Sequence, residues 1–298
     1  MTTQSPRKIR FTKMHGAGND FIVLNGITND LSAVTKEQWR KLAHRQLGVG
    51  ADQILIVEKT TRSDADFRYR IFNADGGEVE QCGNGSRCFV RYIHEQGLSV
   101  KNPLRVEVAH SIITLEALAD GQVKVNMGAP IFEPQRIPFD PTGLPSKLEF
   151  HETLYALPIS RNAGTHADWI AAISMGNPHA IQIVDDIESA PVVSEGMQIE
   201  ANSAFPQRVN AGYMQILDAH AIRLRVYERG AGETLACGTG ACAAVVSGIR
   251  RGLLLSPVRV ETRGGNLEIV WPGMLDGQPQ AVEMYGPAMT VFEGETIL

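Results

Sequence analysis

The chain has 298 residues, of which 43% are hydrophobic and 20% charged, and its formal net charge is −5; these are ordinary values for a globular protein. Its length favours two domains of usual size. No basic block suggests a nucleic-acid partner, and no apolar stretch is long enough for a membrane span or a signal core, so we expect a soluble, cytoplasmic protein.

Short apolar or alternating segments predict strands along most of the chain. In chain order they cover residues 21–24, 54–57, 123–127, 180–184, 222–227 and 267–270. Helical patterns are confined to residues 35–47, between a Thr35 cap and Gly48, and to residues 86–96 and 241–251, which end at Gly97 and Gly252. The proline-rich segment 130–145 is expected to link two halves.

One pattern occurs twice. In residues 72–85 and again in 227–240, a strand ends in a polar residue, Asn73 or Glu228, and Cys-Gly-x-Gly follows nine positions later, before a helix. Gly-Asn also precedes a strand at Asn19 and at Asn177, 158 residues apart, while Cys82 and Cys237 are 155 apart. A duplicated unit with a small insertion explains these offsets.

The repeated cysteines indicate proton transfer. A cysteine before a helix N-terminus lies in a positive field, which is expected to lower its pKa, and the neighbouring N–H groups can hold a carboxylate. Two such thiols could invert a carbon next to a carboxylate, one removing the α-proton and the other returning a proton on the opposite face. Cys88 and Cys242, inside apolar helices, are expected to be buried packing residues.

The combined motifs resemble the diaminopimelate epimerase family. They are residues 11–21 (FTKMHGAGNDF), 73–76 (NADG), 82–85 (CGNG), 176–179 (GNPH), 228–230 (ERG) and 237–240 (CGTG). The resemblance implies an α/β fold of two pseudo-symmetric domains, each a curved, mostly antiparallel sheet around a central helix, with the site in the cleft between them. The expected domains are residues 1–130, onto which the tail 280–298 folds back, and 131–279.

The resemblance also implies interconversion of LL- and meso-2,6-diaminopimelate without a cofactor, in lysine and peptidoglycan biosynthesis. Cys82 and Cys237 correspond to the catalytic cysteines, and His179 and Glu228 to residues that adjust their pKa values. The substrate contacts implied are Asn19, Gln53, Asn73, Gly83, Asn84, Asn177, Asn210, Glu228, Arg229, Gly238 and Thr239. Arg229 would hold the distal carboxylate bidentately. Members usually form homodimers, and Phe292 stands where some relatives have a tail tyrosine used in the dimer contact.

Three other functions stay open. A proline racemase or hydroxyproline epimerase would share the cysteine pair but would not need Arg229 and several asparagines for a second amino-acid group. A redox or metal-binding protein could use the four thiols, although intervals of six and five residues are unusual for zinc, and we expect no metal. An inactive binding relative would not need both cysteines.

Overall fold

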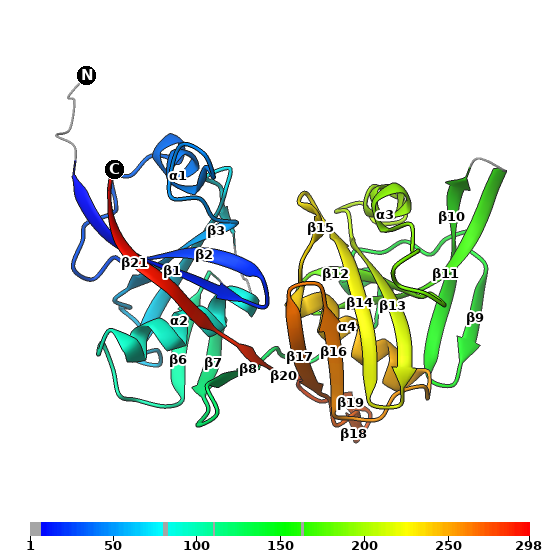
Figure 1. Ribbon diagram of the computed structural model, residues 1–298. Helices are drawn as coiled ribbons and strands as arrows, with labels where there is room; N and C mark the ends of the chain where they lie inside the picture. The colour runs from blue at the N-terminus through cyan, green and yellow to red at the C-terminus, as the bar shows by residue number, and fades with distance from the viewer. Residues whose placement is uncertain (1–6, 80–82, 110, 162–163) are drawn as a thin grey trace. The chain divides into compact units, whose positions relative to one another are not determined.

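The computed structural model describes residues 7–79, 83–109, 111–161 and 164–298 (Figure 1). The chain divides into two compact units, one comprising residues 1–125 and 286–298 and the other residues 126–285. No helix among the described residues is long and apolar enough to span a membrane.

The first unit is a sheet in which strands from both ends of the chain are neighbours. Its hydrogen-bonded order is β21-β1-β2-β3-β4-β6-β7-β8. The pairs β2–β3 and β4–β6 are parallel, and the others are antiparallel. The strands are β1 (Lys8–Gly16), β2 (Asn19–Asn25), β3 (Gln53–Glu58), β4 (Phe67–Asn73), β5 (Glu78–Val79, paired with β4), β6 (Leu104–Val108), β7 (Ser111–Ala117), β8 (Gln122–Asn126) and β21 (Met289–Ile297).

The second unit repeats this order of pairings. Its strands run β9-β10-β11-β12-β13-β14-β16-β17-β20, and the parallel pairs are β12–β13 and β14–β16. The strands are β9 (Ser146–Glu149), β10 (Glu152–Arg161), β11 (Gly164–Ser174), β12 (Pro178–Ile183), β13 (Asn210–Asp218), β14 (Ala221–Glu228), β15 (Gly232–Thr234, paired with β14), β16 (Val258–Thr262), β17 (Gly265–Val270) and β20 (Glu283–Pro287), with a separate hairpin of β18 (Met274–Leu275) and β19 (Gln278–Pro279).

A buried helix lies against each sheet. Helix α2 (Gly83–Glu95) contacts β1, β2, β3 and β7, and α4 (Gly238–Arg250) contacts β11 to β14 and β17. In Figure 1, α4 lies behind β14 and β16. Cys88 and Cys242 are completely buried in these helices, as the apolar pattern predicts. The predicted fold of two similar, mostly antiparallel sheets around central helices is therefore confirmed.

Two helix predictions were wrong. Helix α1 (Lys36–Ala43) has the predicted Thr35 cap, as a capping box with Gln38, but it ends four residues before Leu47. It ends there because His44 adopts an extended backbone and its Nδ1 accepts hydrogen bonds from the N–H groups of Gln46 and Leu47. Helix α3 (Val192–Glu200) was not predicted; its apolar face is short and it has no side-chain cap.

The proline-rich segment 130–145 is part of the second unit, not a linker. Ile131 forms a bridge with Ser174, a short 3-10 helix (Pro134–Arg136) follows, and Ile137 and Phe139 are buried in the core of this unit. Phe139 stacks on Phe205 with ring centroids 4.6 Å apart. The prolines therefore shape a turn that inserts apolar side chains into the core.

Candidate active site

Cys237 is held at the N-terminus of α4. It is the N-cap residue, is 4% exposed, and its Sγ accepts a hydrogen bond of 3.4 Å from the N–H of Gly240. The Oγ1 of Thr239 lies 3.5 Å from the same sulfur. Gly238 and Thr239 are the first two residues of the helix, where backbone N–H groups have no acceptor within the helix. This end of α4 therefore offers a thiol next to an anion-binding backbone.

Helix α2 begins at Gly83, and the cysteine that precedes it, Cys82, lies outside the described residues. Asn84 is buried, and its Oδ1 accepts a hydrogen bond of 2.9 Å from Nη2 of Arg87. Arg87 is completely buried and also donates through Nε to the carbonyl of Pro287, at 3.1 Å. Arg87 was not predicted as a site residue, although an arginine within an apolar helix was the signal that could have revealed it.

The second glycine of each Cys-Gly-x-Gly motif is required by packing. A Cβ atom at Gly85 would lie 2.2 Å from the hydroxyl of Tyr69 in β4. A Cβ atom at Gly240 would lie 3.0 Å from Val226 in β14 and 3.2 Å from the sulfur of Cys237. These glycines let the first turn of each helix pack closely on a strand.

The pKa of Cys237 is shifted opposite to the direction predicted. Burial raises the pKa of the Cys237 thiol well above its ordinary value, and the negative charge of Glu228, which also accepts a hydrogen bond from the thiol, raises it further. The hydrogen bonds from Thr239 and Gly240 act in the other direction but do not outweigh burial. Cys237 is therefore a neutral thiol at neutral pH, a form suited to donating a proton.

Glu228 is placed beside Cys237 by the β14–β15 hairpin. The hydroxyl of Thr234 in β15 donates a short hydrogen bond to Oε1 of Glu228, and Glu228 is paired with Gly232 across the hairpin. The carboxylate therefore remains an acceptor next to the thiol, and its charge opposes formation of a thiolate.

We expect Glu228→Gln to speed alkylation of Cys237 by iodoacetamide. Removing the neighbouring charge lowers the pKa of the thiol, and only the thiolate reacts, so the rate at a pH below that pKa should rise about tenfold. The rate would be followed at Cys237 by peptide mass spectrometry over a series of buffers from weakly acidic to alkaline. Glu261→Gln is the control, because Glu261 pairs with Arg223 and has no part in raising the pKa of Cys237. Unchanged alkylation in Glu228→Gln would contradict this electrostatic coupling.

Asn177, His179 and Asn210 form one connected group at the ends of β12 and β13. His179 is fully buried, its Nε2 lies 3.0 Å from Oδ1 of Asn177, and it is paired with Asn210 across the two parallel strands. Burial, and then the charge of Arg229, lowers the pKa of His179 to about 3. The imidazole is therefore neutral at physiological pH and donates from Nε2 to the amide of Asn177.

The turn that carries Arg229 is fixed at several points. Its backbone N–H donates to Oδ1 of Asn210 at 2.8 Å, and its Nη1 donates to the carbonyl of Gln207 at 3.0 Å. The next N–H, of Gly230, donates to Oε1 of Glu200 at 3.1 Å. Glu200 is buried at the end of α3 and was missed by sequence analysis, because that helix was not predicted.

In the first unit, three predicted substrate contacts lie on adjacent strands. Nε2 of Gln53 donates to Oδ1 of Asn73 at 2.8 Å, and the two residues are directly paired in β3 and β4. Asn19 begins β2, and its Nδ2 donates to Oδ2 of Asp52 at 2.9 Å. Because Gln53 donates through its amide nitrogen, the hydrogen bond to Asn73 sets the orientation of the Gln53 side-chain amide.

The predicted site residues that the structure describes thus form two groups, one in each unit. Among the described residues, no three His, Cys, Asp or Glu side chains are close enough to hold a metal ion. The groups are Asn19, Gln53, Asn73, Gly83 and Asn84, and Asn177, His179, Asn210, Glu228, Arg229, Cys237, Gly238 and Thr239.

Similar solved structures share this fold. A PhzF-family phenazine biosynthesis protein from Bacillus anthracis has a TM-score of 0.68 and 17% identity, covering 98% of this chain and 100% of its own. A hydroxyproline epimerase from Agrobacterium vitis, with bound trans-4-hydroxy-L-proline, has a TM-score of 0.69 and 14% identity, covering 98% of this chain and 93% of its own. At such low identity the likeness concerns the fold alone.

Sequence relatives are much more similar. The family described as diaminopimelate epimerase matches residues 11–133 and 171–291. The diaminopimelate epimerase of Cupriavidus taiwanensis is 63% identical over 287 residues, which cover 96% of each chain. That of Ralstonia pickettii is 61% identical over 287 residues, covering 96% of this chain and 95% of the relative. Because the match extends over nearly the whole length at this identity, the chain belongs to the diaminopimelate epimerase family.

Proposed function

We propose that this protein interconverts LL- and meso-2,6-diaminopimelate by a two-base mechanism that uses Cys82 and Cys237 and needs no cofactor. The observation that carries the proposal is the neutral, buried thiol of Cys237 at the N-terminus of α4, in a unit whose topology repeats that of the unit containing Cys82. The product would serve lysine and peptidoglycan biosynthesis.

The chemistry needs an acid on one face of the α-carbon and a base on the other. Cys237, as a thiol, delivers a proton, while Cys82, as a thiolate, removes one; in the reverse direction the roles exchange. Removal of the α-proton places negative charge on the α-carboxylate. The N–H groups of Gly238 and Thr239, together with those of Gly83 and Asn84, stabilise that charge because they are oriented before the reaction begins.

The remaining residues recognise the second amino-acid group of the substrate. Arg229 binds the distal carboxylate, because a planar guanidinium matches both of its oxygens. The amides of Asn19, Gln53, Asn73, Asn177 and Asn210 bind the ammonium and carboxylate groups. Burial and the charge of Glu228 keep Cys237 protonated in the resting enzyme, and neutral His179 orients Asn177.

We also propose that the two halves of the epimerase are residues 1–130 with the tail 280–298, and residues 131–279.

We further propose that the protein is a cytoplasmic homodimer. Strand β21 exposes Val291 (55%) and Phe292 (48%), and Phe292 packs edge-on against Phe11 with ring centroids 5.8 Å apart. Exposed apolar side chains on a strand are suited to an interface. Light scattering should give twice the mass of the chain, and a monomer would contradict the dimer.

The direct test is exchange of the α-proton. The purified, EDTA-treated protein would be incubated with LL-diaminopimelate in deuterated water, and deuterium at the α-carbon would be read by NMR together with the stereoisomer ratio. We expect deuterium incorporation coupled to formation of the meso isomer, and none with L-proline. Exchange of proline alone would favour a proline racemase, and activity only after metal addition would favour a metalloenzyme.

A further inference from the structure

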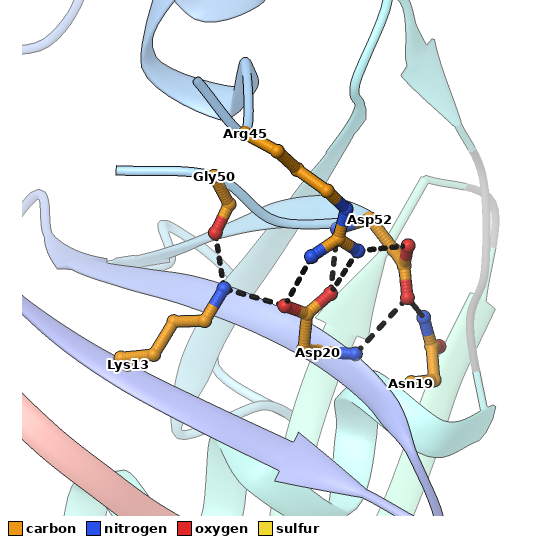
Figure 2. Close-up of polar contacts among 6 residues, drawn as sticks. All are labelled: Lys13, Asn19, Asp20, Arg45, Gly50 and Asp52. Atoms are coloured by element: carbon orange, nitrogen blue, oxygen red, sulfur yellow. Dashed lines mark hydrogen bonds and ion pairs between the residues drawn. The ribbon is translucent and has the colours of Figure 1, made fainter. Parts of the chain in front are cut away.

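Four charged side chains of the first unit form a network beside Asn19 (Figure 2). The carboxylate of Asp20 accepts hydrogen bonds from Nζ of Lys13 at 2.6 Å and from two nitrogens of Arg45 at 2.9 and 3.1 Å. The backbone N–H of Asp52 donates to the same carboxylate at 2.9 Å. Both oxygens of Asp20 are thus occupied by donors, so this carboxylate serves the network itself.

The carboxylate of Asp52 connects this network to Asn19. One oxygen of Asp52 accepts from Nη2 of Arg45 at 2.7 Å. The other accepts from Nδ2 of Asn19 at 2.9 Å and from the backbone N–H of Asp20 at 3.2 Å. Figure 2 shows the resulting chain of contacts from Lys13 through Asp20 and Arg45 to Asp52 and Asn19.

The four charged side chains have no net charge together, and they differ in how far they are exposed. Lys13 and Arg45 offset the charges of Asp20 and Asp52. The side chains of Lys13 and Asp20 are 11% and 18% exposed, whereas those of Arg45 and Asp52 are 56% and 45% exposed. Although burial alone would raise it, the hydrogen bonds from Arg45 and Lys13 hold the pKa of Asp20 far below its usual range, so this carboxyl stays ionised.

An ionised carboxylate can only accept hydrogen bonds, which decides how the amide of Asn19 is turned. Its nitrogen must face Asp52, and its oxygen then lies on the opposite edge of the amide. The reciprocal backbone bonds between Asp20 and Asp52 also tie the start of β2 to the residue before Gln53. Two predicted substrate contacts are therefore held in register by the same pair of aspartates.

We propose that Lys13, Asp20, Arg45 and Asp52 are positioning residues that fix the Asn19 amide so that it presents an acceptor, Oδ1, to a protonated nitrogen of the substrate. The inference rests on the proposed epimerase function and adds to it the residues that set the polarity of one contact. An amide turned the other way would present a donor and repel an ammonium group.

The test is a double-mutant cycle on kcat/KM for LL-diaminopimelate. Asp52→Ala should lower kcat/KM about tenfold to a hundredfold, the range for loss of a hydrogen bond involving a charged group, and mainly by raising KM. Asn19→Ala should lower it by at least as much. If Asp52 acts through Asn19, the double variant should be no worse than Asn19→Ala within about twofold. Asp52→Asn, which retains an acceptor oxygen, should recover part of the loss.

Asp64→Ala is the matched control, because Asp64 has the same 45% side-chain exposure and pairs with Arg62 in the same unit. It should leave kcat/KM unchanged. Thermal unfolding of all variants separates folding losses from the kinetic effect, and Arg45→Met offers a second disruption at an exposed position. The positioning role would be overturned if the loss of kcat/KM in the double variant equalled the product of the two single losses, or if Asp52→Ala kept full activity. An inactive wild-type protein would instead refute the proposed function.

Discussion

Cys237→Ala is expected to lower kcat for epimerisation by about a thousandfold to ten-thousandfold while the protein stays folded. Positioned proton transfer contributes up to about this much to a rate, and alanine can neither give nor take a proton. The stability cost should be on the order of 1 kcal/mol, because only one buried sulfur atom is removed. The measurements are NMR of the stereoisomer ratio and urea unfolding.

Cys242→Ala is the control for that experiment. Cys242 is completely buried one turn further along α4, so its replacement should cost similar stability and no activity. Comparable activity losses in both variants would mean that the effect comes from packing of α4, and full activity in Cys237→Ala would return Cys237 to a structural role.

The two cysteine variants should also differ in a way that only a two-base mechanism explains. With one cysteine removed, the thiolate form of the other can still abstract the α-proton that faces it and, after exchange with solvent, return a deuteron to the same face. Cys237→Ala and Cys82→Ala should therefore each exchange the α-proton slowly, with retention, and on opposite stereoisomers. Exchange of the same stereoisomer by both variants would point to a single base.

Much of the fold could be predicted because the same sequence motifs occur in both halves of the chain. The motif at Asn19 recurs at Asn177, and that at Cys82 recurs at Cys237; the parallel pairs β2–β3 and β12–β13 follow from this repetition. The family and the isomerase activity predicted from these motifs are confirmed by relatives of 61–63% identity. The early end of α1 and the burial of Ile137 were missed. Neither feature is marked by a repeated motif, and both depend on tertiary contacts.

The electrostatics of the site could not be predicted in the same way. A helix N-terminus is visible in sequence and favours a thiolate, but the burial of Cys237 and its contact with Glu228 arise only when β14, β15 and α4 pack together. Arg87 donates a buried hydrogen bond to Asn84, and the buried carboxylate of Glu200 accepts one from the N–H of Gly230. The positions of such buried charges follow from packing, which local pattern does not encode.

Arg229→Ala should raise KM for diaminopimelate and lower kcat/KM about a hundredfold, with a smaller change in kcat. The guanidinium would bind a carboxylate that takes no part in bond changes, so its loss removes binding common to substrate and transition state. Arg229→Lys should recover only part of the loss, because an ammonium keeps the charge but not the two parallel hydrogen bonds.

The decisive comparison uses lysine, which is diaminopimelate without the distal carboxylate. If Arg229 binds that carboxylate, the wild-type enzyme and Arg229→Ala should exchange the α-proton of lysine at similar, low rates. Arg223→Ala is the matched control, since Arg223 lies in β14, the strand that ends just before Arg229, and forms an ion pair with Glu261. An equal penalty for Arg229→Ala on both substrates would mean that this arginine supports the turn held by Asn210 and Gln207 and does not bind the carboxylate.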